Sequence, residues 1–145
     1  MIENNHLLST ESNFLLNRLI EQYQKQDQII IAYDFDDTVS PCYCMNCNDV
    51  QSVLRMSKRL LNAYLIVYTS NPDKDKIKKF LNKYEIPYDS INENAPFVPF
   101  KNPNNKIFYN ILLDDKSGLG EAVNVLKTLN RLVLNGVITK ENKDV

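Results

Sequence analysis

The sequence predicts an α/β domain built on a small, mostly parallel sheet of about four strands with helices on both faces. Three observations support this prediction. Short apolar runs rich in β-branched residues occupy residues 29–33, 63–68 and 107–113, as expected for strands buried on both faces. Stretches with apolar residues three and four positions apart alternate with these runs and predict amphipathic helices. Polar or acidic residues directly follow each run.

The first part of the chain is predicted to contain a helix, a strand and a loop. The helix spans about residues 11–25, and Thr10 or Ser12 is a candidate for its N-cap. A polar break separates it from the first strand at residues 29–33. Residues 38–48 contain a proline, three cysteines and two asparagines, and they are predicted to form a loop.

The middle of the chain is predicted to alternate between helix and strand. A helix over residues 49–62 is expected to be capped by Asp49, and residues 63–68 form the second strand. The next helix covers residues 72–84, with a proline in its first turn and Asn71 as its N-cap.

The last part of the chain is predicted to complete the sheet and to add one helix. Residues 86–91 contain a proline and are expected to hold a short edge strand, and residues 92–105 form a loop. The run 107–113 is the last strand. A helix then begins after two glycines and ends at Gly136, and residues 137–145 are expected to be a frayed tail.

The composition is that of one globular domain spanning residues 1–145. Hydrophobic residues make up 43% and charged residues 24% of the chain, which is ordinary for a folded protein. The formal net charge of −1 provides no basic surface for long nucleic acids, whose affinity depends on Lys and Arg at the phosphates. A small phosphorylated substrate is compatible with this charge. Nothing in the composition indicates an oligomeric state.

The sequence also bears on where the protein is located and on the state of its cysteines. No apolar run approaches the roughly 18 residues of a membrane helix, and the N-terminus lacks the layout of a signal peptide, so a cytoplasmic protein is expected. Cys42, Cys44 and Cys47 lie in the predicted loop, where reduced thiols beside the site are expected. A structural zinc site is not favoured, because zinc usually takes a full tetrahedral set of ligands and His6 is the only histidine.

Side chains suited to phosphate chemistry stand at the ends of the predicted strands. They are Asp34 and Asp36 after the first strand, Thr69 and Ser70 after the second, Lys106 before the last, and Asp114 and Asp115 after it. In open α/β sheets, ligands bind outside the carboxyl ends of the strands, at the point where the strand order reverses. We therefore expect these groups to converge on one site.

The order of these motifs resembles that of the haloacid dehalogenase superfamily of phosphohydrolases. The motifs are D-F-D-D-T at 34–38, L-I-V-Y-T-S at 65–70, Lys106, and I-L-L-D-D at 111–115. The resemblance covers most of the chain and implies a three-layer, Rossmann-like fold. It also implies a magnesium-dependent phosphatase that hydrolyses phosphate monoesters through an aspartyl-phosphate intermediate.

The resemblance implies a role for each acid. Asp34 would be the nucleophile, and Asp36 would donate a proton to the leaving oxygen and later accept one from water. Magnesium would be bound by the Asp34 carboxylate, the Asp36 backbone carbonyl and the Asp114 carboxylate, with Asp115 acting through water. Asp37 has no expected role beyond that of a solvated turn residue.

Thr69 and Lys106 would bind the remaining phosphoryl oxygens. Ser70 is an alternative to Thr69, because strand ends are predicted only to within a residue or two. Lys101 is an alternative to Lys106, which is preferred because it directly precedes the last strand.

The short segments between the motifs leave no room for the cap domain of larger relatives, so the resemblance implies a capless member with an open site. Specificity would then depend on the loops 40–48 and 92–105, with Tyr43 and Met45 expected near the leaving group. These loops do not identify the substrate.

Three other functions are compatible with the same residues. They are a non-catalytic module that binds phosphorylated ligands, a nucleotide or nucleic-acid end phosphatase, and a receiver-like signalling domain. In a receiver the acidic pair comes first and the phosphorylated aspartate ends a later strand, whereas D-F-D-D-T here ends the first strand. The absence of a basic stripe argues against a tightly bound nucleic-acid duplex.

Overall fold

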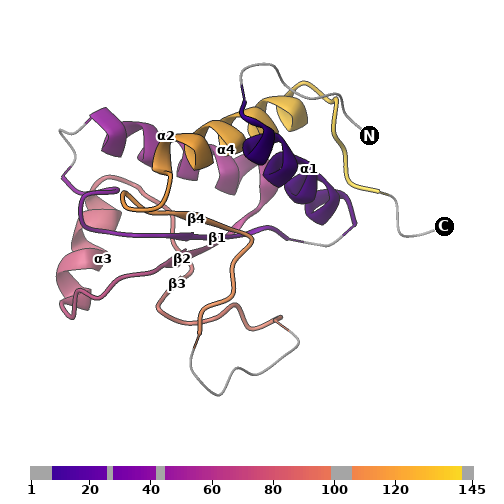
Figure 1. Cartoon of the computed structure of the whole chain (residues 1–145). Coiled ribbons are helices and arrows are strands. Elements are labelled where there is room, and N and C mark those ends of the chain that lie inside the picture. The colour runs from indigo at the N-terminus through magenta and orange to yellow at the C-terminus, as the bar shows by residue number, and fades with distance from the viewer. Residues whose placement is uncertain (1–7, 26–27, 42–44, 99–105, 142–145) are drawn as a thin grey trace.

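The fold is described by a computed structural model that covers residues 8–25, 28–41, 45–98 and 106–141. Within these residues the elements are, in chain order, α1 (Thr10–Lys25), β1 (Ile30–Tyr33), α2 (Met45–Leu61), β2 (Tyr64–Val67), α3 (Lys74–Lys83), β3 (Ser90–Ile91), β4 (Ile111–Leu113) and α4 (Leu119–Leu134). The predicted α/β class is confirmed (Figure 1). No described helix is both long and apolar enough to cross a bilayer.

The strands form one parallel sheet in the order β3-β2-β1-β4. β1 is central, and its Ile31 pairs with Leu65 of β2 on one side and with Ile111 of β4 on the other. β2 and β3 follow one another on one side of β1, and β4 then pairs with the opposite side of β1. These pairings confirm the predicted small parallel sheet. The strand order reverses between β1 and β4, and ligands bind at such a reversal in folds of this kind.

The two faces of the sheet are covered differently. Buried residues from all four helices form one cluster with Ile31 and Tyr33, and α4 lies between α1 and α2 over this face (Figure 1). On the other face, Ile30 and Ala32 pack against non-helical residues such as Ala95. The prediction of helices on both faces is therefore wrong for the described residues. Successive right-handed crossovers in one direction place α2 and α3 on the same side, and the connection from β3 to β4 covers the other.

The helices α2 and α3 begin elsewhere than predicted. α2 begins at Met45, so Asp49 lies inside the helix rather than at its cap, and Cys47 is buried rather than a loop thiol. Tyr43, the other two cysteines and the Met45 side chain lie outside the described residues. The side chain of Asp73, rather than that of Asn71, caps α3, because it accepts a hydrogen bond from the backbone N–H of Lys76.

The N-cap of α1 and the residues that follow α4 differ from the prediction. The hydroxyl of Ser9 accepts a hydrogen bond from the backbone N–H of Ser12, so Ser9, rather than Thr10 or Ser12, serves as the side-chain cap of α1. Gly136 ends α4 as predicted, with a φ of +72° that glycine adopts without steric cost. Ile138 is buried in the core, so the frayed-tail prediction is wrong for the described residues beyond Gly136.

Candidate active site

The turn that follows β1 brings Thr38 back toward Asp34. The carbonyl oxygen of Phe35 accepts hydrogen bonds from the backbone N–H groups of the next turn, at 3.4 Å from Thr38 and 3.1 Å from Val39. Asp37 adopts a φ of +64°, in the left-handed region that aspartate tolerates better than most residues. Asp37 is exposed, as predicted for a solvated turn residue.

Three carboxylates meet at the carboxyl ends of β1 and β4. We name Asp34, Asp114 and Asp115 the acidic cluster, because each offers an oxygen and these oxygens all lie within 4.8 Å of one another. Asp34 and Asp114 are half-buried and Asp115 is exposed. The cluster stands where the strand order reverses, so the predicted convergence of the two acidic motifs is present.

Thr38 joins the two halves of the acidic cluster. Its hydroxyl oxygen lies 3.3 Å from a carboxylate oxygen of Asp34 and 3.4 Å from one of Asp115, and it accepts a hydrogen bond of 3.1 Å from the backbone N–H of Asp115. The side chain is fully buried. Sequence reasoning gave Thr38 no role, although its place as the last residue of D-F-D-D-T was the available signal.

The acidic cluster carries uncompensated negative charge. The pKa of Asp34 is raised to about 6, first by burial, then by the charge of Asp114 and by a hydrogen bond with Asp115. None of the ion pairs in the described part of the chain involves the cluster. Closely spaced carboxylate oxygens are the ligands that Mg²⁺ and Ca²⁺ prefer, so the donor set fits a hard divalent cation.

A cavity of about 300 Å³ opens beside the acidic cluster. Besides the cluster itself, its lining comprises Asp36, Asp37, Tyr68, Thr69, Ser70 and Lys116. Every predicted site residue in the described part of the chain, except Lys106, therefore lines a single cavity.

Asp36 lies at the rim of this cavity. Its side chain is exposed, and one carboxylate oxygen accepts a hydrogen bond of 3.3 Å from the side-chain amide of Asn71. Asn71 thus holds the position of Asp36 from the segment that follows β2. The sequence suggested only a helix cap for Asn71, because its proximity to Asp36 depends on the pairing of β1 with β2.

Thr69 is held in place more firmly than Ser70. Asn92 exchanges two hydrogen bonds with the Thr69 backbone, accepting from its N–H at 2.9 Å and donating to its carbonyl at 2.7 Å. The Thr69 hydroxyl accepts from the backbone N–H of Asn71 at 3.1 Å, so its own proton remains available for an anion. Ser70 makes no comparable bond among the described residues. The geometry favours Thr69 as the hydroxyl of the site.

Lys106 is not brought to the cavity. It precedes β4, and this segment approaches from the opposite end of the sheet (Figure 1), where the Lys106 carbonyl accepts a hydrogen bond from the Asn94 side chain. Lys116 lines the cavity instead, directly after the acidic pair, with its backbone N–H bonded to Asp114 at 3.0 Å. The alternative, Lys101, lies outside the described residues.

Comparisons with protein-family models, with curated proteins and with solved structures find no match to this chain. The function is therefore inferred from the geometry of the site and from the chemistry of its side chains.

The raised pKa of Asp34 predicts a pH dependence of stability in the metal-free protein. Between its ordinary pKa of 3.8 and the folded-state value of about 6, the folded state binds more protons than the unfolded state, so stability falls as pH rises through this window. Asp34→Asn should therefore raise the melting temperature at about pH 7.5, by about 2–4 °C, and the gain should shrink toward about pH 4.5.

Thermal unfolding of both proteins in chelator, at several pH values, measures this effect. Glu93→Gln is the matched control, because Glu93 is exposed and lies outside the acidic cluster. If Asp34→Asn and the parent had the same melting temperature at both ends of the pH range, ionised Asp34 would not destabilise the acidic cluster.

Proposed function

We propose that this protein is a magnesium-dependent phosphatase of the haloacid dehalogenase type, which hydrolyses phosphate monoesters through an aspartyl-phosphate. The supporting observation is the meeting of Asp34 with Asp114 and Asp115 at the strand-order reversal, beside a cavity that also receives Asp36 and Thr69. Each chemical role in the reaction has a side chain of the required type within this one cavity.

The acidic cluster is the proposed cation site. Asp34, Asp114 and Asp115 would hold Mg²⁺, with the backbone carbonyl of Asp36 as a further ligand expected from the resemblance. When bound, the cation offsets the repulsion that otherwise keeps a phosphate dianion away from three carboxylates. Thr38 orients Asp34 and Asp115 from behind, which is the usual function of groups that contact metal ligands.

Asp34 and Asp36 would divide the covalent and proton-transfer work. The Asp34 carboxylate attacks phosphorus, the bond from phosphorus to the ester oxygen breaks, and that oxygen takes a proton from Asp36. Water then attacks the phosphorus of the aspartyl-phosphate and gives a proton to Asp36 as the bond to Asp34 breaks. Inorganic phosphate leaves. The exposed position of Asp36 at the rim suits exchange of protons with both the leaving group and water.

Thr69 and Lys116 would bind the phosphoryl oxygens that the cation does not. The free proton of the Thr69 hydroxyl can be donated to a phosphoryl oxygen, and the Lys116 ammonium supplies a compensating charge. Lys116 takes the role that the sequence suggested for Lys106. The cavity is open at the surface of the described chain, and a capless phosphatase of this kind would accept its substrate directly from solvent.

The nucleophile is tested by Asp34→Asn. We expect the hydrolysis of p-nitrophenyl phosphate in excess Mg²⁺ to fall by about a thousandfold or more, because an amide cannot form the acyl-phosphate. Asp37→Asn is the matched control. Asp37 is the third acid of the same D-F-D-D-T motif and has no assigned role, and asparagine tolerates its left-handed backbone.

Full magnesium-dependent activity of Asp34→Asn would exclude the mechanism. If the parent protein binds inorganic phosphate in the presence of Mg²⁺ but hydrolyses no ester, the cavity belongs to a non-catalytic module instead.

The hydroxyl of the site is tested by two single changes. Thr69→Val should lower kcat/KM by about 10- to 100-fold, because it removes the donor while keeping the shape of the side chain. Ser70→Ala should change kcat/KM less than about twofold. The reverse pattern would assign the hydroxyl role to Ser70.

The positively charged side chain that would bind the phosphoryl group is tested by substituting Lys116 and Lys106 separately. Lys116→Gln should lower kcat/KM by about tenfold or more, with a loss that grows at low ionic strength, where charge is less screened. Lys106→Gln should leave activity unchanged, because Lys106 precedes β4 and does not line the cavity. Loss of activity in Lys106→Gln alone would contradict the assignment.

A further inference from the structure

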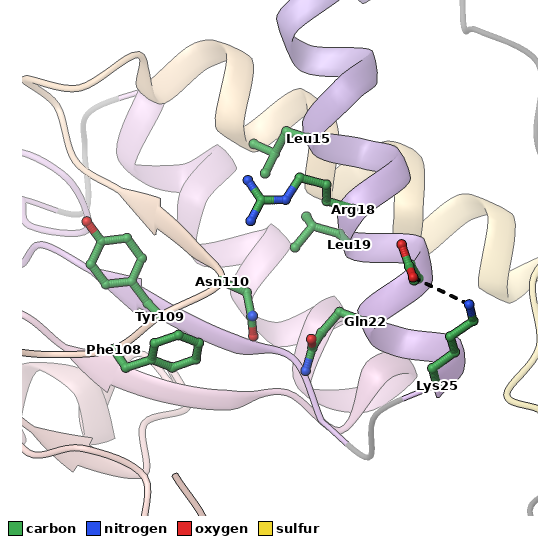
Figure 2. A pocket seen from close by; sticks show the side chains of 9 residues that line it. Leu15, Arg18, Leu19, Gln22, Lys25, Phe108, Tyr109 and Asn110 are labelled. Carbon is green, nitrogen blue, oxygen red and sulfur yellow. Dashed lines mark hydrogen bonds and ion pairs between the residues drawn. The ribbon is translucent and has the colours of Figure 1, made fainter. Parts of the chain in front are cut away.

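A second cavity lies at the opposite end of the sheet from the acidic cluster. It is an open cavity of about 290 Å³ (Figure 2). The residues before β4 that line it are Phe108, Tyr109 and Asn110, and those of α1 are Leu15, Arg18, Leu19, Glu21, Gln22 and Lys25. The backbone N–H of Asn110 donates to the carbonyl of Ile30, which places the cavity at the amino end of the β1–β4 pair. We name it the amino-end pocket.

Arg18 provides a cation that is not neutralised within the described part of the chain. Glu21, the one carboxylate among the lining residues, is paired with Lys25 at 3.4 Å, and none of the described ion pairs includes Arg18. The guanidinium extends from α1 toward the space in front of Asn110 and Tyr109 (Figure 2). A planar fork of N–H donors in this position suits the two oxygens of a carboxylate, phosphonate or phosphate.

The opposite wall supplies apolar surface and further polar groups. Phe108 and Tyr109 keep 36% and 37% of their surface exposed, although both are large hydrophobic residues next to a packed strand. The Asn110 side-chain oxygen accepts from the backbone N–H of Ile30 at 2.7 Å, so its amide hydrogens remain as donors. Gln22 donates to the Gln28 carbonyl at 3.1 Å, and its side-chain oxygen remains as an acceptor.

We propose that the amino-end pocket binds a small organic anion with a planar apolar body. The oxyanion would pair with Arg18, and the body would lie against Phe108 and Tyr109. A volume of about 290 Å³ is at the lower end for small-molecule sites, which limits the body to about one ring. This site is independent of the proposed phosphatase activity, because none of its lining residues belongs to the cavity beside the acidic cluster.

The test uses the metal-free full chain and three one-ring probes, which are benzoate, phenylphosphonate and the neutral isostere benzamide. Amide resonances in two-dimensional NMR spectra report where each probe binds. We expect saturable shifts at residues 108–110, including the Asn110 side chain, with benzoate or phenylphosphonate. Benzamide should bind at least about tenfold more weakly, because it cannot pair with a guanidinium. The stronger of the two anions identifies the preferred oxyanion.

Arg18→Gln should weaken binding of the stronger anion at least about tenfold. Arg59→Gln is the matched control, because Arg59 is exposed on α2 and outside the pocket, and it should bind as the parent does. Arg18→Lys keeps the charge but not the planar fork, and we expect intermediate affinity. It replaces Arg18→Gln if that variant fails to fold.

Three results would overturn the proposal. They are equal affinity of the parent and the Arg18 variants, equal affinity for benzoate and benzamide, and shifts confined to residues around the acidic cluster. The result of this binding test does not depend on whether the protein is a phosphatase, because the probes are not hydrolysed and Mg²⁺ is absent.

Discussion

The pairing of β1 with β4 is the interaction on which the candidate active site depends. Its register runs from Ile31 with Ile111 to Tyr33 with Leu113, and it continues beyond the strand when the backbone N–H of Asp34 donates to the Leu113 carbonyl at 2.9 Å. This ladder holds the carboxylates that follow each strand at a separation that their charges oppose. The apolar core on both sides of β1 stabilises the ladder and so offsets the repulsion at its end.

Much of the sheet and the acidic cluster could be predicted because both depend on local pattern. Asp34 and Asp114 each follow a buried apolar run, and the carboxyl ends of parallel strands share one edge of the sheet. The same rule explains why Lys106 does not line the cavity beside the acidic cluster. A residue that precedes a parallel strand lies at its amino end, whereas Lys116 follows β4 and lines the cavity.

Other parts of the site required the folded structure. The role of Thr38 depends on a turn that passes through a left-handed residue, Asp37. The contact of Asn92 with Thr69 depends on the left-handed backbone of Asn92 itself. Neither conformation follows from residue type alone. The position of the helices also escaped prediction, because a helical pattern shows which face of a helix is apolar but not which side of the sheet it covers.

The two-residue edge strand β3 helps to position a side chain of the proposed chemistry. Asn92 follows its two residues directly, and through Asn92 this strand fixes the backbone of Thr69. Edge elements with few backbone bonds open at a much lower free energy than the rest of a domain. Transient opening of β3 would therefore release Thr69 without unfolding β1 or β4. The site would then lose one of its proposed donors while the carboxylates of the acidic cluster stay in place.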